Sequence, residues 1–178
     1  MRSVLNPQLE LSETDIGAVR ISLKSRDDIP KLLLGLQHIY THPELRAAVF
    51  EILKGVVPNK VGGKGKARIS LGRPGMAQWR ILVLGTLRLC LNTDYDRLVE
   101  LANHHVTIRQ MMGHAGQIDD LDPTEYTLQT VKDNLQLFTP QILGRINEVV
   151  VRAGHELVKK KTRATIASRS TPELIHSS

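Results

Sequence analysis

Apolar residues return every three or four positions over most of this chain, which is the spacing of one face of an α-helix. The pattern is clear from Ile29 through Leu33 and Leu36 to Ile39, and again over residues 45–56. A two-residue alternation occurs only over residues 19–23, which could form one short strand or an extended arm. The spacing predicts an all-α fold: a helical hairpin, then a helix-turn-helix-like bundle and two further helices.

Capping residues and prolines divide this helical pattern. Helices are expected to begin near Asp27–Asp28, after Thr41–His42 and at Thr93 or Asp94, and Thr139–Pro140 is expected to restart the chain. Glycine and proline between residues 55 and 75 sustain neither periodicity. We expect an N-terminal arm at 1–26, the hairpin at 27–57, a basic glycine-rich linker at 58–74, a second helical region at 75–161 and a disordered tail at 162–178.

Composition excludes several classes of protein. The 178 residues are 41% apolar, enough for one or two small cores, and the single cysteine, Cys90, excludes a disulfide framework. We interpret Cys90, within an apolar run, as a buried small hydrophobe, and Trp79, Met111 and Met112 as core residues. No membrane-length apolar stretch or signal peptide is visible, so we expect a cytoplasmic protein without a membrane partner.

Positive charge is concentrated in one region of the sequence. The formal charge is +6, yet residues 52–93 hold eight Lys or Arg and no Asp or Glu. Such a block is typical of binding to a polyanion, most plausibly nucleic acid. Aromatic residues make up 3% of the chain, too few to stack single-stranded bases, so duplex DNA is the more natural partner.

The sequence contains no pattern typical of a catalytic, metal or cofactor site. His104, His105 and His114 lack the HExxH spacing of a zinc site, and a role in turns and helix caps is the better interpretation. The glycine-rich stretch 61–66 lacks the GxxxxGK[ST] spacing of a phosphate loop. We therefore expect no catalytic residues, no metal and no cofactor.

Four segments resemble the N-terminal region of bacterial insertion-sequence transposases of the ISNCY type. They are LKSRDDIPKLLLGLQHIY (23–40), GRPGMAQWRILVLGTLRLCLNTDYDRLVELANHH (72–105), IRQMMGH (108–114) and YTLQTVKDNLQLFTPQILGRINEVVVRAGHELVKKK (126–161). The resemblance covers about residues 1–161 and implies a helical region that binds the terminal inverted repeats and helps assemble the synaptic complex.

In that family a ribonuclease-H-like domain with an Asp-Asp-Glu triad follows the helical region. Here residues 162–178 contain no strand series and only one carboxylate, Glu173. Two-metal strand transfer requires several converging carboxylates. We therefore expect a transposase-related polypeptide that ends before its catalytic domain and does not cut DNA alone.

These observations favour a DNA-binding and assembly module that recognises inverted repeats. Linker cations would contact phosphates, whereas base contacts would come from the short helix after Asn103 or from the helix near residue 130, a choice that spacing leaves open. The candidate DNA-binding residues are Lys60, Lys64, Lys66, Arg68, Arg73, Thr107, Arg109, Gln110, Thr127, Gln129, Thr130, Lys132 and Asp133.

The alternative is a helical oligomerisation or regulatory protein that acts through protein partners. In that hypothesis the apolar hairpin pairs with a second copy of the chain or with full-length transposase. Gel filtration with and without a duplex separates the two hypotheses, because only the first predicts a shift of the duplex.

Overall fold

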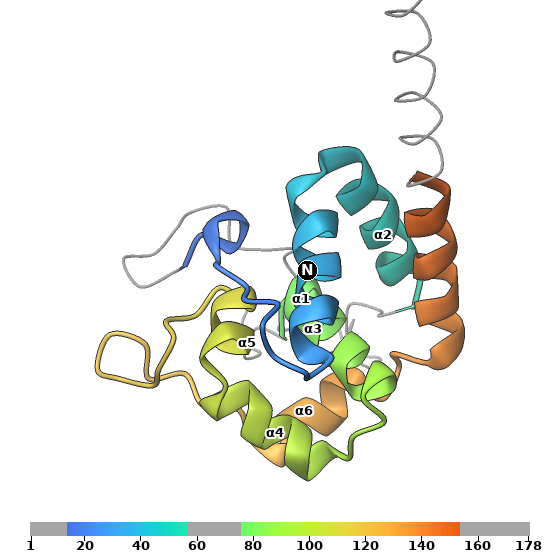
Figure 1. The fold of residues 1–178 in the computed structure, drawn as a ribbon. Helices are drawn as coiled ribbons and strands as arrows, with labels where there is room; N and C mark the ends of the chain where they lie inside the picture. Colours follow the sequence, from blue (N-terminus) through green and yellow to red (C-terminus); the bar gives the residue numbers. More distant parts are fainter. Residues whose placement is uncertain (1–13, 57–75, 154–178) are drawn as a thin grey trace, which may run out of the picture.

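The computed structural model describes residues 14–56 and 76–153 of the chain, and within these ranges every regular element is helical (Figure 1). The predicted all-α fold is confirmed. In chain order the elements are the 3₁₀-helix η1 (Ile16–Ala18), α1 (Ile29–Thr41), α2 (Pro43–Val56), α3 (Gln78–Cys90), α4 (Tyr95–His104), α5 (Val106–Met111), α6 (Leu128–Leu135) and an unlabelled helix over residues 140–153.

The helical hairpin forms because of a local break between α1 and α2. Asp27 Oδ1 accepts a hydrogen bond of 3.1 Å from the backbone N–H of Ile29, which satisfies one of the free donors at the start of α1. Pro43 restricts the residue before it to extended backbone, and His42 has φ −106° and ψ 102°. The chain therefore leaves α1 at His42 and begins α2 immediately, as the sequence predicts.

Helix α3 lies at the centre of the fold (Figure 1). All of its residues from Gln78 to Leu87 except Arg80 are buried, which is typical of a helix covered on every side. It contacts α1, α4 and α6. The indole Nε1–H of Trp79 donates to the Met111 carbonyl at 2.6 Å, and this bond joins α3 to the end of α5.

Side-chain caps set the remaining helix boundaries. At the start of α4, Asp94 Oδ1 accepts a hydrogen bond from the N–H of Arg97 at 2.7 Å. At the start of α5, His105 Nδ1 accepts one from the N–H of Ile108 at 3.3 Å. At the start of α6, the Thr127 hydroxyl accepts one from the N–H of Thr130 at 3.2 Å. The predicted start at Asp94 is confirmed. Of the three histidines assigned to turns and caps, His105 caps α5, whereas His114 is buried and its assignment is wrong.

One core cluster includes residues from the N-terminal arm to the last described helix. Ile16 and Val19 belong to it, as do Leu53, Met112 and Ile146. The end of the predicted arm is therefore part of the folded body. Residues 19–23, which could have formed a strand, contain none, and the side-chain amide of Gln37 instead donates to the carbonyls of Ile16 and Val19 at 3.0 and 2.8 Å.

Three predicted features lie outside the described ranges: residues 1–13 of the arm, the whole linker at 58–74, and the tail at 162–178. Trp79, Met111 and Met112 are fully buried, so their assignment to the core is confirmed. The prediction for Cys90 is wrong. Its side chain is exposed, because Cys90 is the last residue of α3, beyond the stretch that neighbouring helices cover.

Candidate nucleic-acid interface

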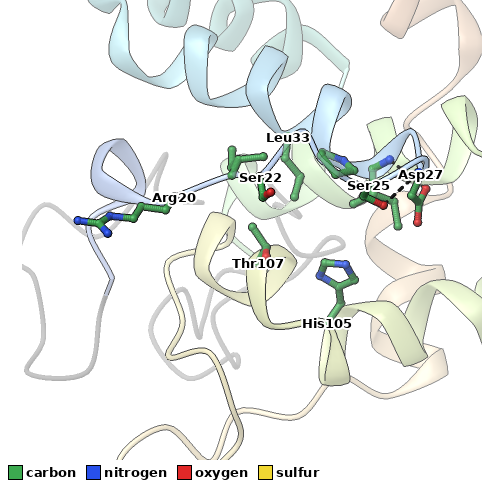
Figure 2. Close-up of a pocket in the computed structure, with 10 residues that line it drawn as sticks. Arg20, Ser22, Ser25, Asp27, Leu33, His105 and Thr107 are labelled. Carbon is green, nitrogen blue, oxygen red and sulfur yellow. Dashed lines mark hydrogen bonds between the residues drawn. The ribbon is translucent and has the colours of Figure 1, made fainter.

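A pocket of about 250 Å³ lies between the segment 20–27, the first turns of α1 and the start of α5 (Figure 2). Its walls combine exposed polar side chains with buried apolar ones. Ile29 and Leu33 of α1 are buried, whereas Arg20 and Ser22 are exposed. The full set of lining residues is Arg20, Ile21, Ser22, Ser25, Asp27, Ile29, Pro30, Leu33, His105 and Thr107.

Two residues at the start of α5 face this pocket. In Figure 2, Thr107 points toward Ser22, and His105 lies below Ser25 and Asp27. His105 is held in place because its Nδ1 accepts the N–H of Ile108 at 3.3 Å. An imidazole that accepts at Nδ1 carries its hydrogen at Nε2, so the other ring nitrogen of His105 is a donor.

The segment that forms one wall of the pocket is basic. Arg20, Lys24 and Arg26 are all exposed, and no acidic residue occurs between Asp15 and Asp27. This small cluster of positive charge is visible in the sequence, but the prediction of a polyanion partner rests only on the larger basic block at residues 52–93. The structure adds that this segment and the start of α5 line the same pocket.

Three of the eight cations in the basic block of residues 52–93 belong to the described residues. Lys54 Nζ pairs with Glu51 at 2.6 Å, Arg80 Nε donates to the Met112 carbonyl at 3.1 Å, and Arg88 stacks over the Tyr95 ring at 4.3 Å from its centroid. These three cations interact within the folded body. The other five, which are Lys60, Lys64, Lys66, Arg68 and Arg73, lie outside the described residues.

The excess of positive charge follows the same division. The described residues include 13 Lys or Arg and 14 Asp or Glu, a net charge of −1, whereas the whole chain carries +6. Residues 57–75 carry five cations and no acid. All of the excess positive charge is therefore carried by residues outside the described ranges.

The prediction that Arg109 contacts DNA is wrong. Its side chain is fully buried. The guanidinium donates to Asp122 Oδ2 and to the Thr124 carbonyl, both at 3.0 Å, and to the Ala115 carbonyl at 3.2 Å. A side chain engaged in this way cannot reach a base edge, and it instead fastens the 113–126 loop to α5.

The other predicted contact residues differ in their access to solvent. Gln110 and Thr107, both on α5, are half-buried, because α5 packs into the body with Ile108, Arg109 and Met111 buried. Gln129, Lys132 and Asp133 are exposed on α6, where the Gln129 amide donates to Asp133 at 2.7 Å. Of the two helices that the sequence left open, α6 presents the more accessible polar face. Thr127 and Thr130 form its cap and its first turn.

A buried polar network surrounds the Arg109 contact. Asp122 Oδ2 also accepts the backbone N–H of Ala115 at 2.9 Å and lies 3.1 Å from His114 Nδ1. The Tyr126 hydroxyl lies 2.6 Å from His114 Nε2. A carboxylate can only accept, so His114 Nδ1 carries the hydrogen and Nε2 accepts from the phenol. Sequence reasoning missed this network, since its members carry no local signal.

Burial lowers the pKa of His114 to about 4, and the neighbouring Arg80 charge acts in the same direction. Burial alone raises the pKa of Asp122, but hydrogen bonds from Thr124 and from the Ala115 backbone outweigh it and hold that pKa below its usual value. His114 is therefore neutral in the folded protein at neutral pH, with Asp122 ionised.

The neutral imidazole predicts a loss of stability in mild acid. The unfolded chain binds a proton at His114 near pH 6.5 and the folded chain only near pH 4, so the free energy of unfolding falls as the pH decreases between these values. The difference between these two pKa values corresponds to a loss of about 3 kcal/mol in the free energy of unfolding. Urea unfolding at several pH values measures it. His114→Gln should flatten the profile over this range and the exposed-site control His104→Gln should not; equal slopes for both variants would contradict the assignment.

The apolar faces of the hairpin are used within the chain. Leu33, Leu36, Leu45, Val49 and Leu53 are all buried in the common core. These five side chains are therefore engaged within the chain and are not free to pair with a second copy, as the alternative hypothesis would require.

No group of three His, Cys, Asp or Glu side chains within residues 14–56 and 76–153 is arranged to hold a metal ion. None of the helices in these ranges has the length and apolar character needed to cross a membrane. Comparison with known proteins found no matching family model, no matching curated protein and no matching solved structure.

Proposed function

We propose that this protein binds duplex DNA, with the basic residues between positions 57 and 75 supplying most of the attraction to phosphates. The separation of charge supports this proposal best: five cations without an acid accompany a helical body whose net charge is −1. Cations that neutralise phosphates release condensed counterions, which drives sequence-independent binding.

The proposed target is the terminal inverted repeat of an insertion sequence, as the resemblance to ISNCY-type transposases implies. In this proposal the chain is the DNA-binding and assembly module of such a transposase. Gln129 and Lys132 are the candidates for base contacts, because both are exposed on α6 and their side chains suit adenine and guanine edges in the major groove. The buried Arg109 is excluded from this set.

Replacing Lys60, Lys64 and Lys66 by alanine tests the electrostatic part of the proposal. The triple variant should bind both an inverted-repeat duplex and an unrelated duplex more weakly, since interactions with phosphates carry no sequence information. The slope of log affinity against log salt should also decrease, by up to about 0.9 for each phosphate that the variant no longer neutralises. Fluorescence anisotropy titrations at several salt concentrations measure both quantities.

A second triple variant is the matched control. This control replaces Lys159, Lys160 and Lys161 by alanine, and so removes three positive charges from another part of the sequence. We expect a clearly smaller effect from this control. Equal effects would mean that only net charge matters, and an unchanged affinity and salt slope in the first variant would refute the proposed role of residues 57–75. A concentration-dependent dimer that shifts no duplex would instead favour the protein-partner alternative.

A further inference from the structure

The pocket between the segment 20–27 and α5 is rich in hydrogen-bond donors. Ser22 Oγ accepts the N–H of Lys24 at 3.4 Å, and Ser25 Oγ accepts that of Asp27 at 3.1 Å. Both hydroxyl hydrogens, and the Thr107 hydroxyl, have no partner among the described residues. A ligand that can only accept hydrogen bonds suits such a wall.

Charge around the pocket indicates an anion. Arg20 is among the residues that line it, whereas the exposed Lys24 and Arg26 belong to the same segment but do not line the pocket. Asp27 is the one acid among the lining residues, and its Oδ1 already accepts the N–H of Ile29. With the His105 Nε2–H, the polar wall offers one guanidinium, one imidazole N–H and three hydroxyls against a single carboxylate.

The apolar part of the pocket narrows the choice of anion. Ile21, Ile29, Pro30 and Leu33 form a surface that cannot hydrogen-bond to a fully hydrated ion. A phosphate that is esterified to sugars carries carbon atoms on both sides, and these can pack against such a surface. The combination of donors and apolar carbon matches a sugar–phosphate backbone.

We infer that this pocket holds a backbone phosphate of duplex DNA, contacted by Ser22, Thr107 and His105, while the exposed Arg20, whose side chain points away from these three in Figure 2, adds positive charge beside it. This inference rests on the proposed function and adds a fixed anchor to it. The pocket would position the helical body on the duplex, whereas the basic residues of 57–75 provide attraction. The pocket is lined both by the segment 20–27 and by the start of α5, so a phosphate bound there would contact both parts of the fold.

The test compares three variants of the full chain in duplex titrations. Ser22→Ala with Thr107→Val removes two donors without changing charge. We expect binding at least about tenfold weaker, because the loss of even one hydrogen bond to a charged group has that effect. Arg20→Gln should weaken binding and lower the salt slope by up to about 0.9. Arg145→Gln, the same change at an exposed arginine of the 140–153 helix, is the control and should bind nearly as the wild type does.

A direct probe uses inorganic phosphate. In two-dimensional ¹H–¹⁵N spectra, phosphate should shift the amide signals of residues 20–27 and 105–107 in the wild type, and these shifts should be reduced in the Ser22→Ala, Thr107→Val variant. The same spectra show whether each variant is folded. If it is not, Arg20→Gln and the phosphate shifts in the wild type decide the question.

The outcomes separate this inference from the proposed function. A wild type that binds duplex DNA, with pocket variants that bind equally well and no phosphate shifts in the pocket, would overturn the inference and leave the function standing. A wild type that binds no duplex at low salt would overturn both, even if inorganic phosphate enters the pocket.

Discussion

Replacing Arg109 by methionine should lower the free energy of unfolding by about 3–5 kcal/mol, the typical cost of leaving a buried charge without its partner. Arg109 is fully buried and Asp122 is only 5% exposed, so the carboxylate cannot replace the missing hydrogen bond with one from bulk water. The Thr124 and Ala115 carbonyls are deprived of a donor at the same time. Urea unfolding followed by far-ultraviolet circular dichroism measures the effect.

Two further variants make the Arg109 prediction specific. Arg97→Met is the control, because Arg97 pairs with Glu100 on the surface and should contribute no more than about 1 kcal/mol. Arg109→Lys should rescue little, since one ammonium lacks the planar fork that reaches three acceptors. An Arg109→Met protein that is as stable as the wild type but no longer binds DNA would show that Arg109 reads DNA and that its buried contacts are not formed in solution.

Truncating Trp79 to alanine should destabilise the fold by about 3–5 kcal/mol or more. The indole is fully buried, its centroid lies 5.1 Å from that of Tyr40 and 6.5 Å from that of Phe50, and its N–H satisfies the Met111 carbonyl. One side chain thus connects the hairpin, α3 and α5. Its removal creates a cavity and leaves a buried carbonyl without its donor.

The conservative variant Trp79→Phe separates volume from hydrogen bonding. It keeps most of the apolar packing, so we expect a smaller destabilisation, of about 1–3 kcal/mol. Trp79 is the single tryptophan, so its fluorescence reports on this junction alone. In the wild type, fluorescence and circular dichroism should give coincident transitions, because hairpin and bundle share one core. Two separate transitions would show that residues 27–57 and 75–161 fold as independent units.

Helix boundaries were predictable because the signals that set them are local. Asp94, Thr139–Pro140 and Thr41–Pro43 act on backbone groups within four residues, so the sequence contains both partners of each interaction. The helical class and the core positions of Trp79 and Met112 follow from the same short-range periodicity.

Burial of individual polar side chains was not predictable in this way. Arg109 looked like a surface cation on a short helix, and only the return of the 113–126 loop places Asp122 against its guanidinium, 13 residues further along the chain. Cys90 looked like a core residue, and only the ending of α3 at that position exposes it.

The order of amino acids was sufficient to establish that this chain is helical, where most of its helices begin, and that its positive charge is concentrated in one region. Packing was needed to show which of those charges the folded body uses, and that Arg20, Ser22 and Thr107, 87 residues apart at the extremes, line one pocket. The two kinds of information differ in range, because caps and periodicity depend on neighbours along one helix, whereas burial and pockets depend on contacts between segments that are distant in the chain.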